Sequence, residues 1–401
     1  MIGRTYLDHA ATTPVSPAVL AAMVPFFDSA NPSSLHAEGR AARAAVESAR
    51  ATIARVLGAK SREIVFTGGG SEANNLAVVG AARAVRAADG RRHIVSVATE
   101  HDAVLRALGA LEREGFAVTL LPVDSQGRVA CDAFERALRP DTALASVMLA
   151  NNEIGTLAPI VELARLARAR GVFFHTDAVQ APGRAALDVE TLGVDLLALS
   201  AHKCAGPKGV GVLYVRAGTP LESLVVGGGQ EAGRRAGTEN VAGIVGCAVA
   251  LEMAVRERGV AGPRLAALRD RFEEASLAAI PHARVNGGGA PRLPHISSMA
   301  FAGVSAVDAL IRLDLAGYAV SSGSACAAGS AEPSHVIAAL DAPPWVLAGT
   351  IRISLGSSTS EQDVVALTRM LPGAVAALRV GSHEMGTARN GPLANLLEVR
   401  S

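Results

Sequence analysis

Short apolar runs alternate with longer stretches of helical periodicity through most of this chain, and that alternation predicts an α/β fold. The stretches at 39–57, 103–114 and 160–170 are long enough to cross over a sheet, so neighbouring strands should be mainly parallel. Little room for a helix separates the last two apolar runs, which predicts one antiparallel strand. The expected strands are 64–67, 93–97, 117–121, 143–148, 172–175, 195–199 and 211–215.

A second, smaller α/β unit is expected after a break at 258–263, where Gly and Pro punctuate the chain. A chain of 401 residues also exceeds what one hydrophobic core usually organises. We therefore predict a large domain over 14–259, a small domain from 1–13 and 263–380, and a tail over 381–401 that is loosely ordered or docks a partner. The small domain should contain strands at 296–300, 318–321 and 351–354 and helices at 306–314 and 361–378.

The charge and composition favour small-molecule chemistry. Lys and Arg total 38 against 37 acidic residues, so no overall field attracts nucleic acid or a membrane. No apolar run reaches the length of a membrane span without Gly, Pro or charge, and residues 1–8 lack the apolar core of a signal peptide, so we expect a cytoplasmic protein. The four cysteines lie far apart with no CxxC pair, which argues against a metal site or a disulfide framework.

Lysine is rare in this chain. Only three of the 38 basic residues are lysines: Lys60, Lys203 and Lys208. An arginine can replace a lysine as a surface charge, but its guanidinium stays protonated and cannot form an imine. Lys203 follows an apolar run, where α/β sheets place ligands, and partial desolvation would make its amine available for an imine. Lys208 fits better in a Gly-rich turn, whereas Ser200 and His202 can donate hydrogen bonds to a phosphate.

A glycine-rich turn at 66–75, FTGGGSEANN, stands between an expected strand and a helix. Such a turn binds phosphate, because glycines allow close approach and the N–H groups at the helix start point outward. Ser71 adds a hydroxyl. Gly68, Gly70 and Ala73 also match the GxGxxG/A dinucleotide pattern, and a plain connecting loop would explain the segment as well, so the turn alone leaves the ligand open.

Polar residues follow other expected strands too. A buried carboxylate at Asp177 can hold the proton on a pyridine nitrogen that lets the ring accept electrons, although a helix cap is an equally common role. Gln180 could reach the phenolic oxygen of such a ring. His101 could stack on the ring or move protons near pH 7, with a structural histidine as the alternative. Asn152 is expected to hydrogen-bond the coenzyme that would carry such a ring.

Two further residues stand out in the second unit. Very small residues at 320–330 surround Cys326, and such a run suits a loop that carries a nucleophilic thiol into a cleft. Arg352 is a lone charge inside the apolar run 351–354, so its burial requires an anion. A substrate α-carboxylate or a structural Asp or Glu would each satisfy it.

These segments, in this order, resemble the cysteine desulfurases of the class V aminotransferase family, in the group that includes the nitrogen-fixation and housekeeping iron–sulfur enzymes. The resemblance spans nearly the whole chain and depends on the joint order of the motifs. Besides the residues discussed above, it includes the motifs YLDHAATT (6–13), NPSS (31–34), NNEIG (151–155), DAVQ (177–180), RAGTEN (235–240) and PSHV (333–336).

The resemblance implies fold type I of the pyridoxal-phosphate transferases, with a mainly parallel seven-stranded sheet in the large domain and pyridoxal 5'-phosphate as the cofactor. It implies that Lys203 binds the coenzyme as a Schiff base and moves the substrate Cα proton. Cys326 would then take the sulfur as a persulfide while L-cysteine becomes L-alanine. The sulfur would pass to an acceptor protein, such as an iron–sulfur scaffold, or to a small thiol.

The resemblance also implies the remaining contacts. Asn152 and Arg352 would bind the substrate, and Thr238 would reach the phosphate across a homodimer interface. The implied coenzyme contacts within one subunit are Asp177 at the pyridinium, His101 on the ring, Gln180 at the phenolic oxygen, Asn152, and Gly70, Ser71, Ser200 and His202 at the phosphate.

The nearest alternative is another class V enzyme, such as a selenocysteine lyase or an aminotransferase, which would keep Lys203 and use another substrate. A nicotinamide dehydrogenase leaves Lys203, Cys326 and Arg352 without roles. A non-enzymatic sulfur carrier that keeps the fold would be expected to lack the lysine or to have a disrupted phosphate turn, and this chain has both intact. The chain departs from many relatives only modestly, with Ser71 in place of threonine and a thiol at Cys204. Residues 381–401 do not resemble the C-terminus by which some relatives dock scaffold proteins.

Overall fold

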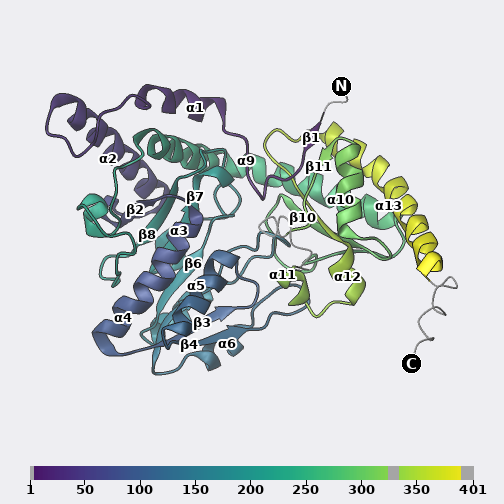
Figure 1. Cartoon of the computed structure of the whole chain (residues 1–401), viewed down its shortest axis with the longest axis horizontal. Helices are drawn as coiled ribbons and strands as arrows, with labels where there is room; N and C mark the ends of the chain where they lie inside the picture. The colour runs from purple at the N-terminus through teal and green to yellow at the C-terminus, as the bar shows by residue number, and fades with distance from the viewer. Residues whose placement is uncertain (1–3, 324–333, 390–401) are drawn as a thin grey trace, which may run out of the picture.

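The computed structural model describes residues 4–323 and 334–389, with side chains up to residue 380 in the last helix. Its centre is a seven-stranded sheet in the order β2-β8-β7-β6-β5-β3-β4 (Figure 1). As the sequence predicts, β8 runs antiparallel to its two neighbours and the other pairs are parallel. The strands are β2 Ile64–Thr67, β3 His93–Val97, β4 Ala117–Leu121, β5 Thr142–Ser146, β6 Phe173–Asp177, β7 Leu196–Ser200 and β8 Gly211–Val215.

Successive residues of the central strands face opposite sides of this sheet and enter two separate cores. Leu197 and Leu199 of β7 pack on one side, whereas Leu196 and Ala198 pack on the other. Every residue of β7 is buried, which is the pattern of a strand covered by helices on both faces. The carboxyl ends of the parallel strands are therefore the part of the sheet left open to a ligand.

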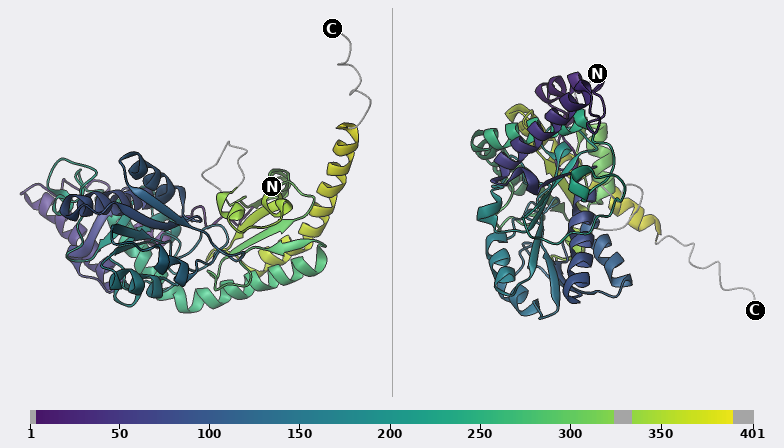
Figure 2. Two further views of the ribbon diagram at one scale, coloured as in Figure 1. Left: turned by 90° about the horizontal axis from the view of Figure 1, so that it is seen from below. Right: turned by 90° about the vertical axis from the view of Figure 1, so that its left-hand side faces the viewer.

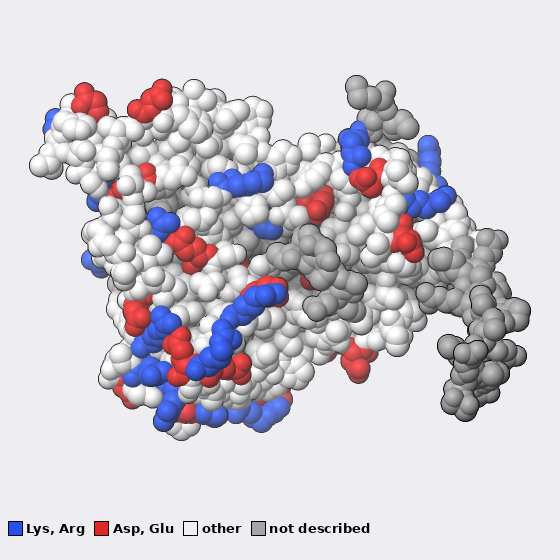
Figure 3. Space-filling view, viewed as in Figure 1, with Lys and Arg blue, Asp and Glu red and all other residues white. Residues whose placement is uncertain are grey.

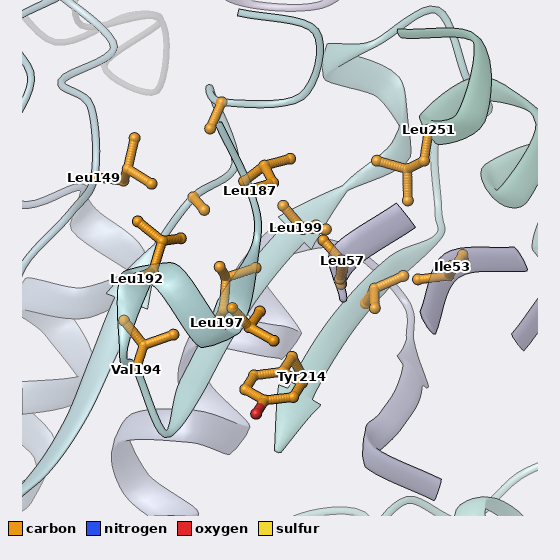
Figure 4. Close-up of a cluster of buried hydrophobic side chains, with 14 of the residues drawn as sticks. Ile53, Leu57, Leu149, Leu187, Leu192, Val194, Leu197, Leu199, Tyr214 and Leu251 are labelled. Atoms are coloured by element: carbon orange, nitrogen blue, oxygen red, sulfur yellow. The ribbon is translucent and has the colours of Figure 1, made fainter. Parts of the chain in front are cut away.

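Helices cover both faces. Figure 4 shows one core, where Leu197 and Leu199 lie near Leu57 of α2 and Leu251 of α9. That face is covered by α2 (Ala37–Leu57), α6 (Cys131–Ala137), α7 (Ile160–Ala169) and the first part of α9 (Val241–Ala279). The other face is covered by α3 (Gly70–Asn75), the π-helical η3 (Leu76–Gly80), α4 (Ala81–Asp89) and α5 (Asp102–Arg113). Shorter elements are α1 (Pro17–Met23), η1 (Val24–Phe26), η2 (Ser61–Glu63), α8 (Val189–Leu192), η4 (Ala201–Lys203) and η5 (Gln230–Gly233).

The second part of the molecule is built on a three-stranded antiparallel sheet, in which β10 (Ile296–Phe301) lies between β9 (Ala283–Val285) and β12 (Thr350–Ser354). β1 (Thr5–Tyr6) pairs with β11 (Tyr318–Ala319), so the N-terminal segment packs against this part, as expected. Its helices are α10 (Ala306–Leu315), α11 (His335–Ala338), α12 (Pro344–Gly349) and α13 (Glu361–Arg389).

The expected break at 258–263 is wrong, because α9 continues through it with Pro263 inside the helix. A helical proline removes one hydrogen bond, and each glycine costs only about 1 kcal/mol relative to alanine. The residues beyond the proline more than offset this cost, since Leu265, Leu268 and Phe272 are buried in the core of the second part. α9 thus extends from one sheet to the other (Figure 2). The proposed division at 14–259 and 263–380 stays a prediction.

Two other expectations need correction. β9 was not predicted, and α13 does not end near residue 378 but runs to Arg389. Residues 381–389 are thus helical rather than a loose tail, and residues 390–401 lie outside the described part of the chain.

The surface agrees with the small net charge. Basic and acidic side chains are interspersed over the face drawn in Figure 3, where charges of one sign do not form a large patch. None of the helices described at 4–323 and 334–389 is both long enough and apolar enough to span a bilayer. The cytoplasmic location stays a prediction.

Candidate active site

A cavity of about 570 Å³ lies at the carboxyl ends of the parallel strands, between the two parts of the molecule. Ligands of open α/β sheets bind at this edge. The structure brings ten of the twelve predicted site residues to its wall: Gly70, Ser71, His101, Asn152, Asp177, Gln180, Ser200, His202, Lys203 and Arg352. Thr238 is exposed and does not line the cavity, and Cys326 lies outside the described residues.

Lys203 projects into this cavity from η4, directly after β7. Its Nζ donates hydrogen bonds to the carbonyl oxygens of Ala10 (2.7 Å) and Ala11 (2.8 Å). The same N-terminal segment also contacts the backbone next to Lys203, because the Thr13 hydroxyl donates to the His202 carbonyl at 2.7 Å. The YLDHAATT motif therefore positions the amine, a role that the sequence did not reveal.

Asp177 ends β6 at the wall of the same cavity and is 6% exposed. Its Oδ2 accepts a hydrogen bond from Asn74 Nδ2 at 2.6 Å, and its Oδ1 accepts one from the Val179 amide at 2.9 Å. These two donors fix the direction of the carboxyl group. Gln180, three residues further on, donates from Nε2 to the Ala10 carbonyl at 2.9 Å.

The glycine-rich turn joins β2 to α3 beside Lys203. A Cβ at Gly70 would lie 2.8 Å from Val179 Cγ2, so this position leaves no room for a side chain. Glu72 supports the turn by accepting from the Gly68 amide at 2.7 Å and pairing with Arg235 at 2.8 Å. α3, η3 and α4 follow one another without interruption, so the amides at the turn begin a long helix and carry its positive dipole.

His202 borders both this cavity and a second one of about 480 Å³ over the glycine turn. Burial and the nearby charges of Lys203 and Lys208 lower the pKa of His202 to about 4. The ring is therefore neutral at pH 7. Its Nδ1 lies 3.0 Å from the Thr12 hydroxyl. A neutral ring next to two cations is suited to donate one N–H to an anion without carrying a charge of its own.

His101 is the N-cap of α5, and its Nδ1 accepts from the Ala103 amide at 3.0 Å. Because Nδ1 accepts this hydrogen bond, the ring N–H donor is at Nε2. The preceding Glu100 is fully buried, and burial, together with the charge of Asp177, raises its pKa well above the usual range. Its Oε1 accepts from the Met148 amide at 2.6 Å. Sequence reasoning missed Glu100 and Asn74, although Asn74 lies inside the glycine-rich turn and Glu100 directly precedes the predicted site residue His101.

Arg352 is almost completely buried in β12. Its Nη2 pairs with Asp8 Oδ1 at 2.7 Å, and its Nη1 donates to the carbonyls of Asn152 (2.8 Å) and Gly323 (3.1 Å). Within the described part of the chain, its Nε is buried without a partner. Of the two anions considered for Arg352, the structure thus shows a structural carboxylate, Asp8, while the arginine also borders the cavity.

The three described cysteines are poor nucleophiles where they stand. Burial raises the pKa of Cys204 to about 12 and that of Cys247 well above its usual range, and both are buried. Burial also raises the pKa of the partly buried Cys131. Although Cys204 follows Lys203 in sequence, it does not line the cavity, and its Sγ donates to the Ala201 carbonyl at 3.3 Å.

Comparison with known proteins agrees with this geometry. The family described as aminotransferase class-V matches residues 5–367. A protein of Dictyoglomus turgidum named cysteine desulfurase IscS is 48% identical over 363 residues, covering 90% of this chain and 92% of that protein. Cysteine desulfurase NifS of Azotobacter vinelandii is 44% identical over 392 residues, covering 97% of this chain and 96% of that protein. A solved NifS-like protein superposes with a TM-score of 0.87 at 35% identity, covering 94% of this chain and 100% of that one.

The fold and site define a class V aminotransferase, and the folds of this family are those of pyridoxal-phosphate enzymes. Within that family the chain belongs to the cysteine desulfurases. The fold class and the family predicted from the sequence are both confirmed, and the dehydrogenase interpretation of the glycine turn is excluded.

Proposed function

We propose that this enzyme binds pyridoxal 5'-phosphate on Lys203 and converts L-cysteine to L-alanine, with Cys326 as the first sulfur acceptor. One observation carries the proposal: the amine of Lys203, the carboxylate of Asp177 and the glycine turn at Gly70 face a single cavity. These are the three kinds of group that an aldehyde, a pyridine nitrogen and a phosphate require.

The residues present fit the coenzyme. The cavity volume falls within the usual range for small-molecule sites, about 300–1,000 Å³. Gly70 provides a cradle that a Cβ would close, and two hydrogen bonds fix the direction of the Asp177 carboxyl group. The phosphate would be held by Gly70, Ser71, Ser200 and His202.

When bound, the coenzyme supplies an electron-accepting ring. Asp177 would hold a proton on the ring nitrogen, His101 would stack on the ring face, and Gln180 and Asn152 would hydrogen-bond its oxygen substituents. Lys203 would remove the substrate Cα proton with its amine, which the carbonyls of Ala10 and Ala11 keep at the edge of the cavity.

Asn152 and Arg352 would bind the substrate. Arg352 already shares its Nη2 with Asp8, so an incoming carboxylate would use its buried Nε or take over part of the Asp8 contact. The position of Arg352 in the middle of β12 keeps this cation fixed.

Sulfur transfer would then use Cys326. Its thiolate would attack the substrate sulfur, and the Cβ–S bond would break with its electron pair left on carbon. Protonation at Cβ and return of a proton to Cα would then give alanine. The outer sulfur of the resulting persulfide would pass to an acceptor protein of iron–sulfur cluster assembly. The relatives named IscS and NifS support this proposal by similarity.

The direct test adds L-cysteine to purified, coenzyme-loaded protein and measures alanine and sulfide with a reducing thiol present. We expect equal amounts of the two products. Release of selenide from L-selenocysteine without comparable sulfide from L-cysteine would instead support a selenocysteine lyase, and amino transfer to a keto acid would support an aminotransferase.

We also propose a homodimer in which Thr238 contacts the partner's phosphate. The segment from α1 to α2 and the segment between β8 and α9 lie together at the end of the molecule opposite α13 (Figures 1 and 2). Both expose large apolar side chains: Leu20, Val24, Phe27, Leu35, Val225 and Val226. Thr238 is exposed in the second of these segments.

Val226→Asp should therefore convert the dimer to a monomer and reduce activity at least about tenfold, because a charge would be buried in an apolar interface. Val226 is 84% exposed in the single chain. Val260→Asp is the matched control, since Val260 is 80% exposed and lies within α9, outside the two segments that form the proposed interface. Sedimentation analysis distinguishes the two. A Val226→Asp protein that sediments like wild type would contradict the proposed interface.

A further inference from the structure

A buried ion pair covers the outer edge of β2, the strand that leads into the glycine turn. β2 is at the end of the seven-stranded sheet and pairs only with β8 within the described residues, so one row of its backbone groups needs other partners. Arg50 of α2 donates from Nη1 to the Ile64 carbonyl at 2.9 Å. Glu231 of η5 accepts from the Phe66 amide at 2.9 Å and pairs with both Nη atoms of Arg50, at 2.7 and 2.8 Å. The two side chains thus take the place of a neighbouring strand.

Both the burial of this pair and the backbone that carries it are costly. Arg50 and Glu231 are each 7% exposed, and a buried ion pair is tolerated only where further hydrogen bonds satisfy its atoms, as the β2 backbone does here. Glu231 and the following Ala232 have φ of +50° and +57°, which residues other than glycine rarely adopt. Such strain persists only where the surroundings fix it, and it is concentrated at functional sites. The strain therefore points to a function for the placement of Glu231.

The same segment is attached to the glycine turn at a second point. Arg235 donates from Nε to Glu72 Oε1 at 2.8 Å, and Glu72 Oε2 accepts from the Gly68 amide at 2.7 Å. The two amides supported in this way, those of Phe66 and Gly68, are two residues apart, which is the spacing of groups on one edge of an extended chain. Residues 231–235 therefore hold the outer side of both the strand end and the turn.

The inner side of the turn packs against β8. A Cβ on Gly211 would collide with the Gly69 carbonyl group, so the two backbones are in direct contact. The turn is thus fixed between β8 on one side and residues 231–235 on the other. Fixed directions matter here, because amides bind an anion most tightly when they do not have to be reoriented.

We propose that Glu231 and Arg235 are positioning residues for the coenzyme phosphate, which fix the direction of the glycine turn from the outer edge of β2. This inference rests on the proposed function, in which the turn holds that phosphate. Neither residue lines either of the two cavities, so both act through other groups: Glu231 through the β2 backbone and Arg235 through Glu72. Their loss should weaken the binding of a ligand only if that ligand carries the phosphate.

The first test compares pyridoxal 5'-phosphate with pyridoxal, which lacks the phosphate. Each is titrated into full-length protein freed of bound coenzyme, and absorbance gives the two dissociation constants. Glu231→Ala should lower the affinity for pyridoxal 5'-phosphate about 10- to 100-fold and the affinity for pyridoxal by less than about threefold, because only the phosphate uses the turn. An unchanged ratio of the two affinities, or an equal loss for both ligands, would overturn the proposal.

Glu273→Ala is the matched control for this test. Glu273 of α9 forms a similarly buried pair with Arg292, at 2.8 and 2.9 Å, and neither residue lines the two cavities. Its loss should lower the thermal stability of the protein, as in Glu231→Ala, but leave the ratio of the two affinities unchanged.

Two further variants keep the proposal testable if the unpaired charge of Arg50 prevents Glu231→Ala from folding. Glu231→Gln should retain more of the preference for the phosphate than Glu231→Ala, because its amide oxygen can still accept from the Phe66 amide. Arg235→Ala leaves the Arg50 pair intact and removes a side chain that is 25% exposed. The ratio of the two affinities should then fall about 3- to 10-fold, because Glu72 loses its partner. A wild-type ratio in Arg235→Ala would overturn the proposal.

The wild-type protein separates this inference from the proposed function. If wild type binds pyridoxal as tightly as pyridoxal 5'-phosphate, the glycine turn is not a phosphate site, and the proposed function and the inference fail together. If wild type prefers pyridoxal 5'-phosphate and the Glu231 and Arg235 variants keep that preference, the positioning role alone fails.

Discussion

Lys203→Arg should reduce the rate of alanine formation at least about 10⁴-fold and abolish the covalent attachment of the coenzyme. Arginine keeps the positive charge and can still donate to the Ala10 and Ala11 carbonyls, so the local packing should survive. It cannot form an imine or accept the substrate Cα proton at neutral pH. Steady-state assays and the absorbance spectrum of the purified variant measure both effects.

Lys60→Arg provides the control for this prediction. Lys60 is exposed at the N-cap of η2 and does not line the cavity, so this substitution makes the same chemical change outside the site. It should retain activity within about twofold of wild type. A Lys203→Arg enzyme with activity near that of Lys60→Arg would contradict the assignment of the amine.

Cys326→Ser should lose sulfur transfer almost completely while it retains the coenzyme absorbance. The hydroxyl is a far weaker nucleophile than a thiolate, so persulfide formation and its transfer to an acceptor should fall at least about 10³-fold. The early absorbance change on adding L-cysteine should persist, because it depends on Lys203. Mass spectrometry of the intact subunit after one turnover measures the added sulfur.

The other thiols test the specificity of that result. Cys131→Ser changes a partly buried thiol at the start of α6, outside the cavity, and should leave persulfide formation intact. Full sulfide release by Cys326→Ser in the presence of reductant would contradict the proposed role and favour a lyase that needs no enzyme thiol.

The main sheet could be predicted from the sequence because its strands are short, apolar and buried on both faces, as in β7. β9 could not, because Ala283–Val285 has only three half-buried residues and depends on pairing with β10 for its existence. The prediction of a break within α9 was wrong for a similar reason, because contacts between distant parts of the chain decide the structure there. Local Gly and Pro signals were outweighed by packing of Leu265 and Phe272 against a distant core.

The site could be predicted in part because α/β sheets gather strand-end residues at one edge, which brought Asp177 and Lys203 together. The residues that orient the predicted side chains of Asp177 and Arg352 were missed. Asn74 meets Asp177 across 103 positions of sequence, and Asp8 meets Arg352 across 344. No local pattern marks such partners, since the polar residue at either position looks like an ordinary turn or cap until the fold is known.

The account depends most directly on a covalent link at one lysine. Coenzyme-supplemented protein should be treated with borohydride, digested, and examined by mass spectrometry. We expect a reduced pyridoxyl adduct on the peptide that contains Lys203, and none on peptides containing only Lys60 or Lys208. An unmodified Lys203 in protein that has bound the coenzyme would contradict the central claim.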